Sequence, residues 1–206
     1  MNAKFLTVLS AAGFLLTAAT GFAGTITFDD IDTGTFGADV LVTIPNGYQG
    51  LNWSNFGAIF ALSHAPVSGY AAGLMSPPNE AYNEWGTPAN FSSPTPFTFT
   101  SAYITGAWNS GLNITIQGFN GATMVDSETI VVSSTAPTLE TFNWSGLTEV
   151  TFNSFGGTPN PTYDGFGTQF ALDNLTINAP TPEPSGSLLV GVGLAALTLL
   201  RKRIRC

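Results

Sequence analysis

Acidic and aromatic side chains alternate in one short stretch of the chain, at Glu80, Tyr82, Glu84 and Trp85. Sugar rings present an apolar C–H face and a rim of hydroxyl groups. A site for them therefore needs aromatic walls and a few carboxylate or amide groups. Asn79 and Asn83 lie in the same stretch, and Tyr70 precedes it. We therefore predict a carbohydrate-binding site at Tyr82, Trp85, Glu80 and Glu84.

The same two glutamates allow an alternative, a glycoside-active enzyme. Such an enzyme needs two carboxyl groups about 5–10 Å apart, one of them with a raised pKa, and a sequence shows neither property. His64 is the only histidine, and Cys206 is the only cysteine. A zinc centre or a thiol nucleophile in the body of the chain is therefore disfavoured. We predict a protein that is not an enzyme, and keep catalysis by Glu80 and Glu84 as the rival hypothesis.

The other three tryptophans each adjoin an asparagine, at Trp53, Trp108 and Trp144. Aromatic side chains dominate the burial of small β domains. We predict that Trp108 and Trp144 lie in core strands, whereas Tyr82 and Trp85 lie in a loop and are better placed to face a ligand.

Aspartates follow the first apolar segment at Asp29, Asp30 and Asp32, and Asp173 lies in the last one. First and last strands are neighbours in many two-sheet folds, and carboxylate oxygens suit Ca²⁺. We predict a structural calcium ion held by Asp29, Asp30 and Asp173. The alternative is that these are solvated aspartates that cap turns at the strand ends.

Short alternating apolar segments separated by Gly, Asn, Pro and Ser predict an all-β fold. The expected strands lie at residues 25–28, 40–44, 58–62, 97–99, 112–116, 129–132, 150–152 and 168–177. This number of strands in residues 24–178 indicates a single β-sandwich domain of the jelly-roll type. We expect residues 64–96, with six prolines, to form a long strandless loop that carries Tyr82 and Trp85.

All five Lys and Arg residues lie at the two ends of the chain, and twelve of the thirteen Asp and Glu residues lie in the body, the exception being Glu183. A body without cations is a poor partner for nucleic acids or anionic lipids. Residues 24–178 also contain no cysteine, so the domain has no disulfide.

The first 23 residues have the pattern of a secretory signal peptide. Lys4 is followed by an apolar segment, and Gly21-Phe22-Ala23 is a small-x-small cleavage sequence. The chain is therefore expected to be exported, with the mature protein beginning at Gly24.

Residues 179–206 form a tripartite tail. Pro182-Glu183-Pro184 precedes an apolar run at residues 185–200, which is followed by Arg201, Lys202, Arg203 and Arg205. The apolar run is short for a hydrocarbon core of about 30 Å, but terminal cations snorkel and extend its reach. Because Lys and Arg stay on the cytoplasmic side, we predict a transmembrane helix at residues 185–200 with its C-terminus inside.

This tail resembles the PEP-CTERM sorting signal of bacterial surface proteins. The resemblance implies that a membrane protease of the exosortase type recognises Pro182, Glu183 and Pro184 and removes the helix. The product would then move from the inner membrane to the cell surface or the extracellular matrix, where such proteins are associated with exopolysaccharide. The body is also diffusely similar to jelly-roll carbohydrate-binding modules. A purely structural, self-associating surface protein without a ligand is a further alternative.

Overall fold

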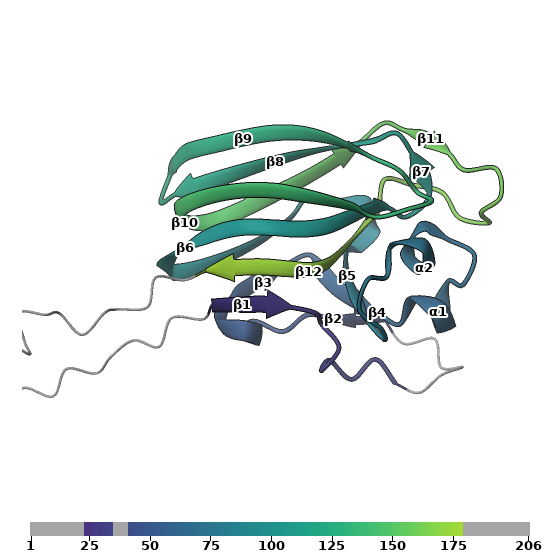
Figure 1. Cartoon of the computed structure of the whole chain (residues 1–206), viewed down its shortest axis with the longest axis horizontal. Helices are drawn as coiled ribbons and strands as arrows, with labels where there is room; N and C mark the ends of the chain where they lie inside the picture. Colours follow the sequence, from purple (N-terminus) through teal and green to yellow (C-terminus); the bar gives the residue numbers. More distant parts are fainter. Residues whose placement is uncertain (1–22, 35–40, 179–206) are drawn as a thin grey trace, which may run out of the picture. The chain divides into compact units, whose positions relative to one another are not determined.

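The computed structural model describes residues 23–34 and 41–178 (Figure 1). Its strands are β1 (Ala23–Ile26), β2 (Leu41–Thr43), β3 (Asn52–Ser54), β4 (Phe56–Ile59), β5 (Glu80–Asn83), β6 (Ala89–Gly106), β7 (Asn109–Ser110), β8 (Leu112–Asn120), β9 (Thr123–Val132), β10 (Thr138–Phe155), β11 (Thr158–Pro159) and β12 (Phe170–Asn178). Its helical turns are η1 (Tyr48–Gly50), α1 (Ala61–His64), α2 (Gly69–Gly73) and η2 (Glu84–Gly86). The expectation of an all-β fold is confirmed.

Ten of these strands form one antiparallel sheet in the order β2-β4-β5-β12-β6-β10-β8-β9, with β1 paired to β12 and β3 paired to β6. The strands β7 and β11 form a separate two-stranded ribbon. Strand β12 pairs with three neighbours, since β6 lies along one of its edges and β5 and β1 share the other.

The sheet folds over on itself through its two longest strands, β6 and β10. Their pairing is interrupted by register shifts, with Leu147 opposite Phe97 and Glu149 opposite Ser92. On one side of this break β6 pairs with β12, and on the other side it pairs with β3. Irregularities of this kind bend and twist a strand. In Figure 1 the strands β8, β9 and β10 consequently lie above β12, β1 and β4, as the two layers of a sandwich.

Aromatic side chains fill the space between the two layers. The burial of β8 alternates at each residue from Leu112 to Gly118, which is the pattern of a strand with one face on the core. Phe152 of β10 contacts Phe56 of β4 and Phe170 of β12, with ring centroids 5.7 Å apart in both cases. Contacts across the core therefore join the two layers.

Two sequence predictions about local structure were wrong. Residues 64–96 contain α2, β5 and the first part of β6, so they are not strandless. The strand expected at residues 58–62 ends at Ile59, and α1 begins at Ala61. All four residues of β5 are buried, because a hydrophobic cluster lies on each of its faces. A strand covered on both faces has no polar–apolar alternation to reveal it.

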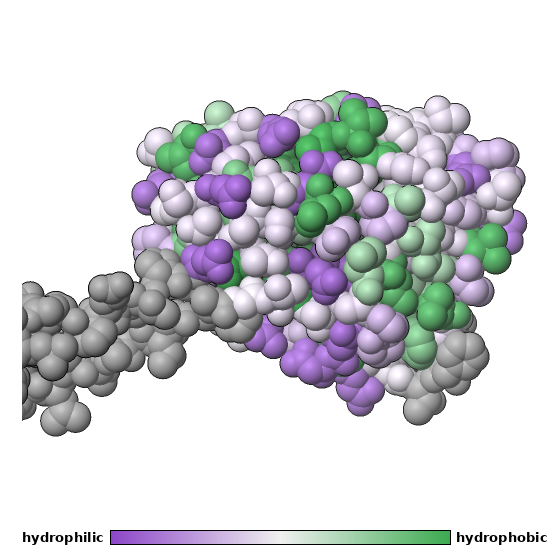
Figure 2. Space-filling view, viewed as in Figure 1, coloured by the Kyte–Doolittle hydropathy of each residue, from purple (hydrophilic) through white to green (hydrophobic). Residues whose placement is uncertain are grey.

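Strongly hydrophobic residues on the surface in Figure 2 lie in small groups among polar ones. Within residues 23–34 and 41–178, no helix has the length and apolar character needed to cross a membrane. The predicted signal peptide, sorting motif, transmembrane helix and basic tail lie outside the described residues.

Candidate functional site

A cleft of about 380 Å³ opens on the outer side of β4 and β5. Its aromatic lining residues are Tyr70, Tyr82, Trp85 and Trp108, and its polar ones are Thr43, His64, Glu84 and Gln169. The cleft stands over a small hydrophobic cluster, separate from the main core, that includes Ile59, Tyr70, Tyr82 and Ala171. The cleft therefore has the apolar walls and few polar groups of a small-molecule site.

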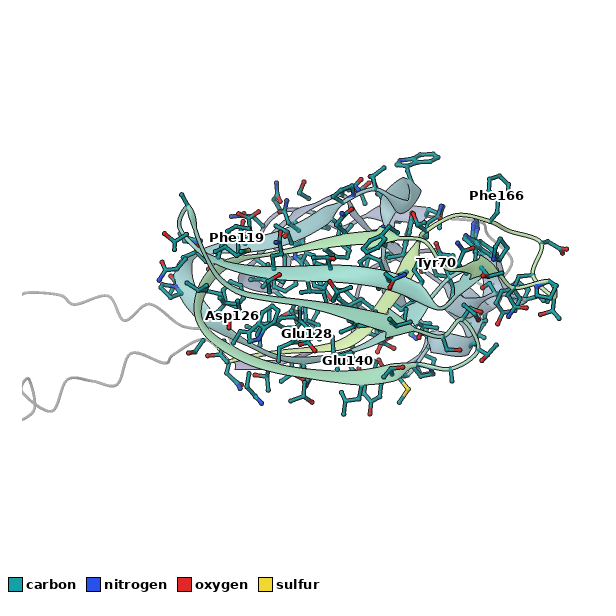
Figure 3. The ribbon with its side chains drawn as sticks, turned by 90° about the horizontal axis from the view of Figure 1, so that it is seen from above. Tyr70, Phe119, Asp126, Glu128, Glu140 and Phe166 are labelled. Carbon is teal, nitrogen blue, oxygen red and sulfur yellow. The ribbon has the colours of Figure 1, made fainter. Side chains whose placement is uncertain are left out.

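Tyr70 fixes the arrangement of the aromatic rings. Its ring meets Tyr82 and Trp108 edge to face, with centroids 5.8 and 5.5 Å apart. Such geometry is favourable for aromatic pairs. Helix α2 brings Tyr70 there because Gly69 packs directly on β6: a Cβ at Gly69 would lie 1.9 Å from the carbonyl oxygen of Gly106. Figure 3 shows Tyr70 at the same end of the domain as Phe166, whose ring projects outward.

The prediction that Tyr82 lies in a loop was wrong: it lies in β5, and its ring packs over a glycine of the neighbouring strand. Gly57 of β4 is its partner in the register, and a Cβ at Gly57 would come within 2.6 Å of the Tyr82 ring. Burial, followed by the nearby charge of Glu84, raises the pKa of the Tyr82 hydroxyl to about 12. Tyr82 is therefore a neutral hydrogen-bonding group at neutral pH.

Trp85 stands at the mouth of the cleft in an unusual conformation. Its side chain is 83% exposed, and its backbone is left-handed, with φ of 58°. A bulky residue with positive φ is strained by about 1–3 kcal/mol, and such strain is concentrated at functional sites. The turn therefore presents the exposed Trp85 indole at the mouth of the cleft.

Three polar side chains brace the turn that carries Trp85. The Asn55 amide donates to Thr87 Oγ1 at 2.6 Å and to the Pro88 carbonyl at 2.9 Å. The Asn83 amide donates to the Thr87 carbonyl at 3.0 Å, and Thr168 Oγ1 donates to the Gly86 carbonyl at 3.0 Å. These bonds, together with the glycine at position 86 with φ of 68°, fix the backbone of the turn from which the indole projects.

The polar groups of the cleft are partly fixed. Thr43 Oγ1 donates a hydrogen bond of 2.7 Å to Glu84 Oε1, which holds the carboxylate on the wall beside β2. Gln169 also lines the cleft, but its Oε1 is buried and has no hydrogen-bond partner among the described residues.

Glu80 does not line the cleft. It has no exposed surface, and neither of its carboxyl oxygens has a hydrogen-bond partner within the described part of the chain. Burial, and then the charge of Asp173, raise the pKa of Glu80 well above its usual range. Glu80 is therefore a neutral buried acid, while Glu84, Tyr82 and Trp85 are brought together at the cleft.

Asp173 is also buried, but its carboxylate is fully hydrogen-bonded. Its Oδ2 accepts from the backbone N–H groups of Met75 and Ser76, both at 2.8 Å. Its Oδ1 accepts from Ser76 Oγ at 3.1 Å and from the Asn174 N–H at 2.7 Å. Burial raises the pKa of Asp173, and these hydrogen bonds oppose that rise.

The other two predicted calcium ligands have their own partners. Asp29 Oδ1 accepts from the Asn79 N–H at 3.1 Å, and Asp30 accepts from the Tyr48 hydroxyl at 2.5 Å. No three Asp, Glu, His or Cys side chains in residues 23–34 and 41–178 gather to hold a metal ion. Calcium binding by Asp29, Asp30 and Asp173 stays a prediction, testable by comparing the Tm in calcium and in EDTA.

The prediction for Trp108 was wrong. Trp108 lies at a bend between β6 and β7 and lines the cleft. Trp144 is in β10 and packs against the main core, as expected, and Trp53 is buried in that core. The three tryptophans that adjoin asparagine look alike in the sequence. The close contact of Gly69 in α2 with Gly106 in β6 joins segments far apart in the chain, so no sequence pattern indicated that Trp108 lines a cleft.

No protein-family model matches the chain, and no curated protein sequence matches it. Among solved structures, a DUF4465 family protein from Bacteroides caccae has a TM-score of 0.50 at 12% identity, over 78% of this chain and 95% of that one. TmCBM61, solved with β-1,4-galactotriose, has a TM-score of 0.35 at 10% identity, over 66% of this chain and 94% of its own. A family 16 carbohydrate binding module has a TM-score of 0.33 at 13% identity, over 69% and 99%. The likeness to the Bacteroides protein concerns the fold alone.

Proposed function

We propose that the protein is a non-catalytic surface protein that binds polysaccharide in the cleft between Trp85 and Trp108. The observation that carries the proposal is Trp85, an exposed indole in a strained backbone conformation at the mouth of an aromatic cleft. Backbone strain of this kind is concentrated at binding and active sites, and the position of the exposed indole at the mouth of the cleft supports a role in packing against a ligand.

The chemistry of the cleft suits a sugar. Tyr82 and Trp85 supply apolar surface for the C–H face of a ring, and the Glu84 carboxylate supplies an acceptor for its hydroxyl groups. The braced turn and the edge-to-face rings keep these groups in place, so that little conformational entropy is lost on binding.

The rival hypothesis of a glycoside-active enzyme requires two carboxyl groups in contact with the substrate. Glu84 faces the cleft, but Glu80 has no exposed surface. A sealed Glu80 offers neither a proton nor a nucleophile to a ligand bound in the cleft. The geometry therefore favours binding over turnover by this pair.

The location of the protein belongs to the same proposal and depends on the sequence of its ends. Residues 1–23 direct export, and the tail anchors the precursor in the inner membrane until a sorting protease of the exosortase type acts at Pro182, Glu183 and Pro184. The released domain then associates with extracellular polysaccharide. This path delivers the cleft to the compartment where such a ligand occurs.

The experiment that tests the binding proposal uses the purified full chain and a panel of polysaccharides that includes the matrix of its own host. We expect Trp85→Ala to weaken binding by about tenfold or more, as for an aromatic residue at the centre of a site. Phe155→Ala is the control, since Phe155 is 47% exposed and lies in β10 outside the cleft. Absence of binding to every glycan would leave a purely structural surface protein as the better account.

A further inference from the structure

We propose that the site holds a stretch of a non-acidic polysaccharide more than one sugar unit long, rather than a single terminal sugar. This inference rests on the proposed function and extends it. It follows from a second hollow beside the cleft and from the charges in both.

The second hollow has a volume of about 310 Å³ and is lined by the segment after α1 and by the loop at residues 164–165. It shares His64 and Trp108 with the cleft. Each hollow alone reaches the lower part of the range, about 300–1,000 Å³, in which proteins enclose a drug-sized molecule. Two adjoining hollows therefore provide room for consecutive rings of a chain.

Trp108 is held firmly between the two hollows. The Tyr70 ring packs on it edge to face, and its carbonyl accepts the Asn160 N–H at 2.9 Å. Gly165 lies so close that a Cβ there would be 2.4 Å from an atom of the indole ring. A rigid indole shared by both hollows is a suitable surface for the junction between neighbouring sugars.

The charges at the site select against acidic chains. Glu84 lies in the cleft and Asp164 lies in the second hollow, while residues 24–178 contain no Lys or Arg. A uronate or sulfate group would find no Lys or Arg side chain there and would be repelled by the carboxylates. Uncharged hydroxyl-rich chains meet no such penalty.

The test measures the affinity of the purified full chain for cello-, manno- and galacto-oligosaccharides of two to six units and for oligogalacturonates. We expect at least one neutral series to bind, with the hexamer about tenfold tighter than the dimer, since a further ring packs on an aromatic face. Val67→Trp should bring that ratio close to one by filling the second hollow, because Val67 lines it and is 58% exposed. Val131→Trp is the matched control, at an exposed valine of β9. Asp164→Asn, an exposed and conservative change, should raise the affinity for oligogalacturonates.

The outcomes separate this inference from the proposed function. A dimer that binds as tightly as the hexamer, or a ratio that Val67→Trp leaves intact, overturns the extended site but retains the carbohydrate-binding cleft. Oligogalacturonates that bind as well as neutral chains overturn the charge selection. If no oligosaccharide or polysaccharide binds at all, the proposed function itself is wrong.

Discussion

Glu80 and Asp173 oppose each other on the neighbouring strands β5 and β12. The register pairs Ala171 with Tyr82 and Leu172 with Ala81, and its continuation sets Asp173 opposite Glu80. Both side chains are buried. Glu80 lies two residues from Tyr82 on β5, Asp173 lies two residues from Ala171 on β12, and side chains two residues apart on a strand point to the same face. Glu80 and Asp173 therefore lie on the same face of the sheet. Asp173 receives hydrogen bonds that favour its charged form, whereas Glu80 receives none from the described residues. The charge of Asp173 therefore adds to the effect of burial in raising the pKa of Glu80.

Glu80→Gln is expected to stabilise the domain at neutral and higher pH. Between the ordinary carboxyl pKa of about 4.3 and the raised folded value, the folded state keeps a proton that the unfolded state has lost. The free energy of unfolding therefore falls as pH rises through this window. Glutamine mimics the protonated acid and removes this loss, so we expect a gain of about 1–3 kcal/mol at pH 8 and almost none at pH 4.

Urea unfolding of the purified protein at several pH values measures this effect. Glu149→Gln, a half-buried site in β10, is the control. An equal effect of Glu80→Gln at pH 4 and pH 8 would show that Glu80 does not titrate in this way.

Trp85→Asn is expected to separate binding from stability. Asparagine adopts the left-handed conformation more readily than tryptophan, so the substitution relieves strain at φ of 58°. We expect the free energy of unfolding to stay the same or to rise by about 1 kcal/mol, while polysaccharide binding is lost. Thermal unfolding and a pull-down on insoluble polysaccharide check the two effects. A marked fall in Tm would instead assign Trp85 a structural role.

The sequence predicted the strands that have one face on the core, because alternation is visible in segments such as residues 112–116. It failed for β5, where Glu80 and Asn83 are buried polar residues and resemble loop residues by composition. The choice of Tyr82, Trp85 and Glu84 depended on residue type, which a sequence displays. The placement of Trp108 in the cleft and of Glu80 beneath it depended on register and on contacts between distant segments, which a sequence does not display.

Gly57→Ala is expected to destabilise the domain and to disturb the cleft. The added methyl group would lie 2.6 Å from the Tyr82 ring, which must then move. Overpacking of this kind costs about 1–3 kcal/mol. A double-mutant cycle with Tyr82→Leu, read by urea unfolding, tests the cause. The cost of Gly57→Ala should shrink when the ring is absent, and an unchanged cost would mean that another contact is responsible.

In its own host, the chain is expected to be cleaved at the tail. If a membrane protease acts at Pro182, Glu183 and Pro184, peptides from the protein at the cell surface should cover the domain and end before the apolar run at residues 185–200. Changing all three motif residues to alanine should leave the full-length precursor in the membrane fraction, because the helix and its terminal cations then stay attached.

Pro159-Asn160-Pro161 provides a matched control for this experiment, because it is a similar triplet within the folded domain. Changing Asn160 there should leave the processing at the tail intact. The readout is the mass of the C-terminal peptide in the surface and membrane fractions. Peptides from residues 185–206 in the surface fraction of the unaltered protein would contradict removal of the helix. Release of the alanine variant would show that cleavage, if it occurs, does not depend on the motif.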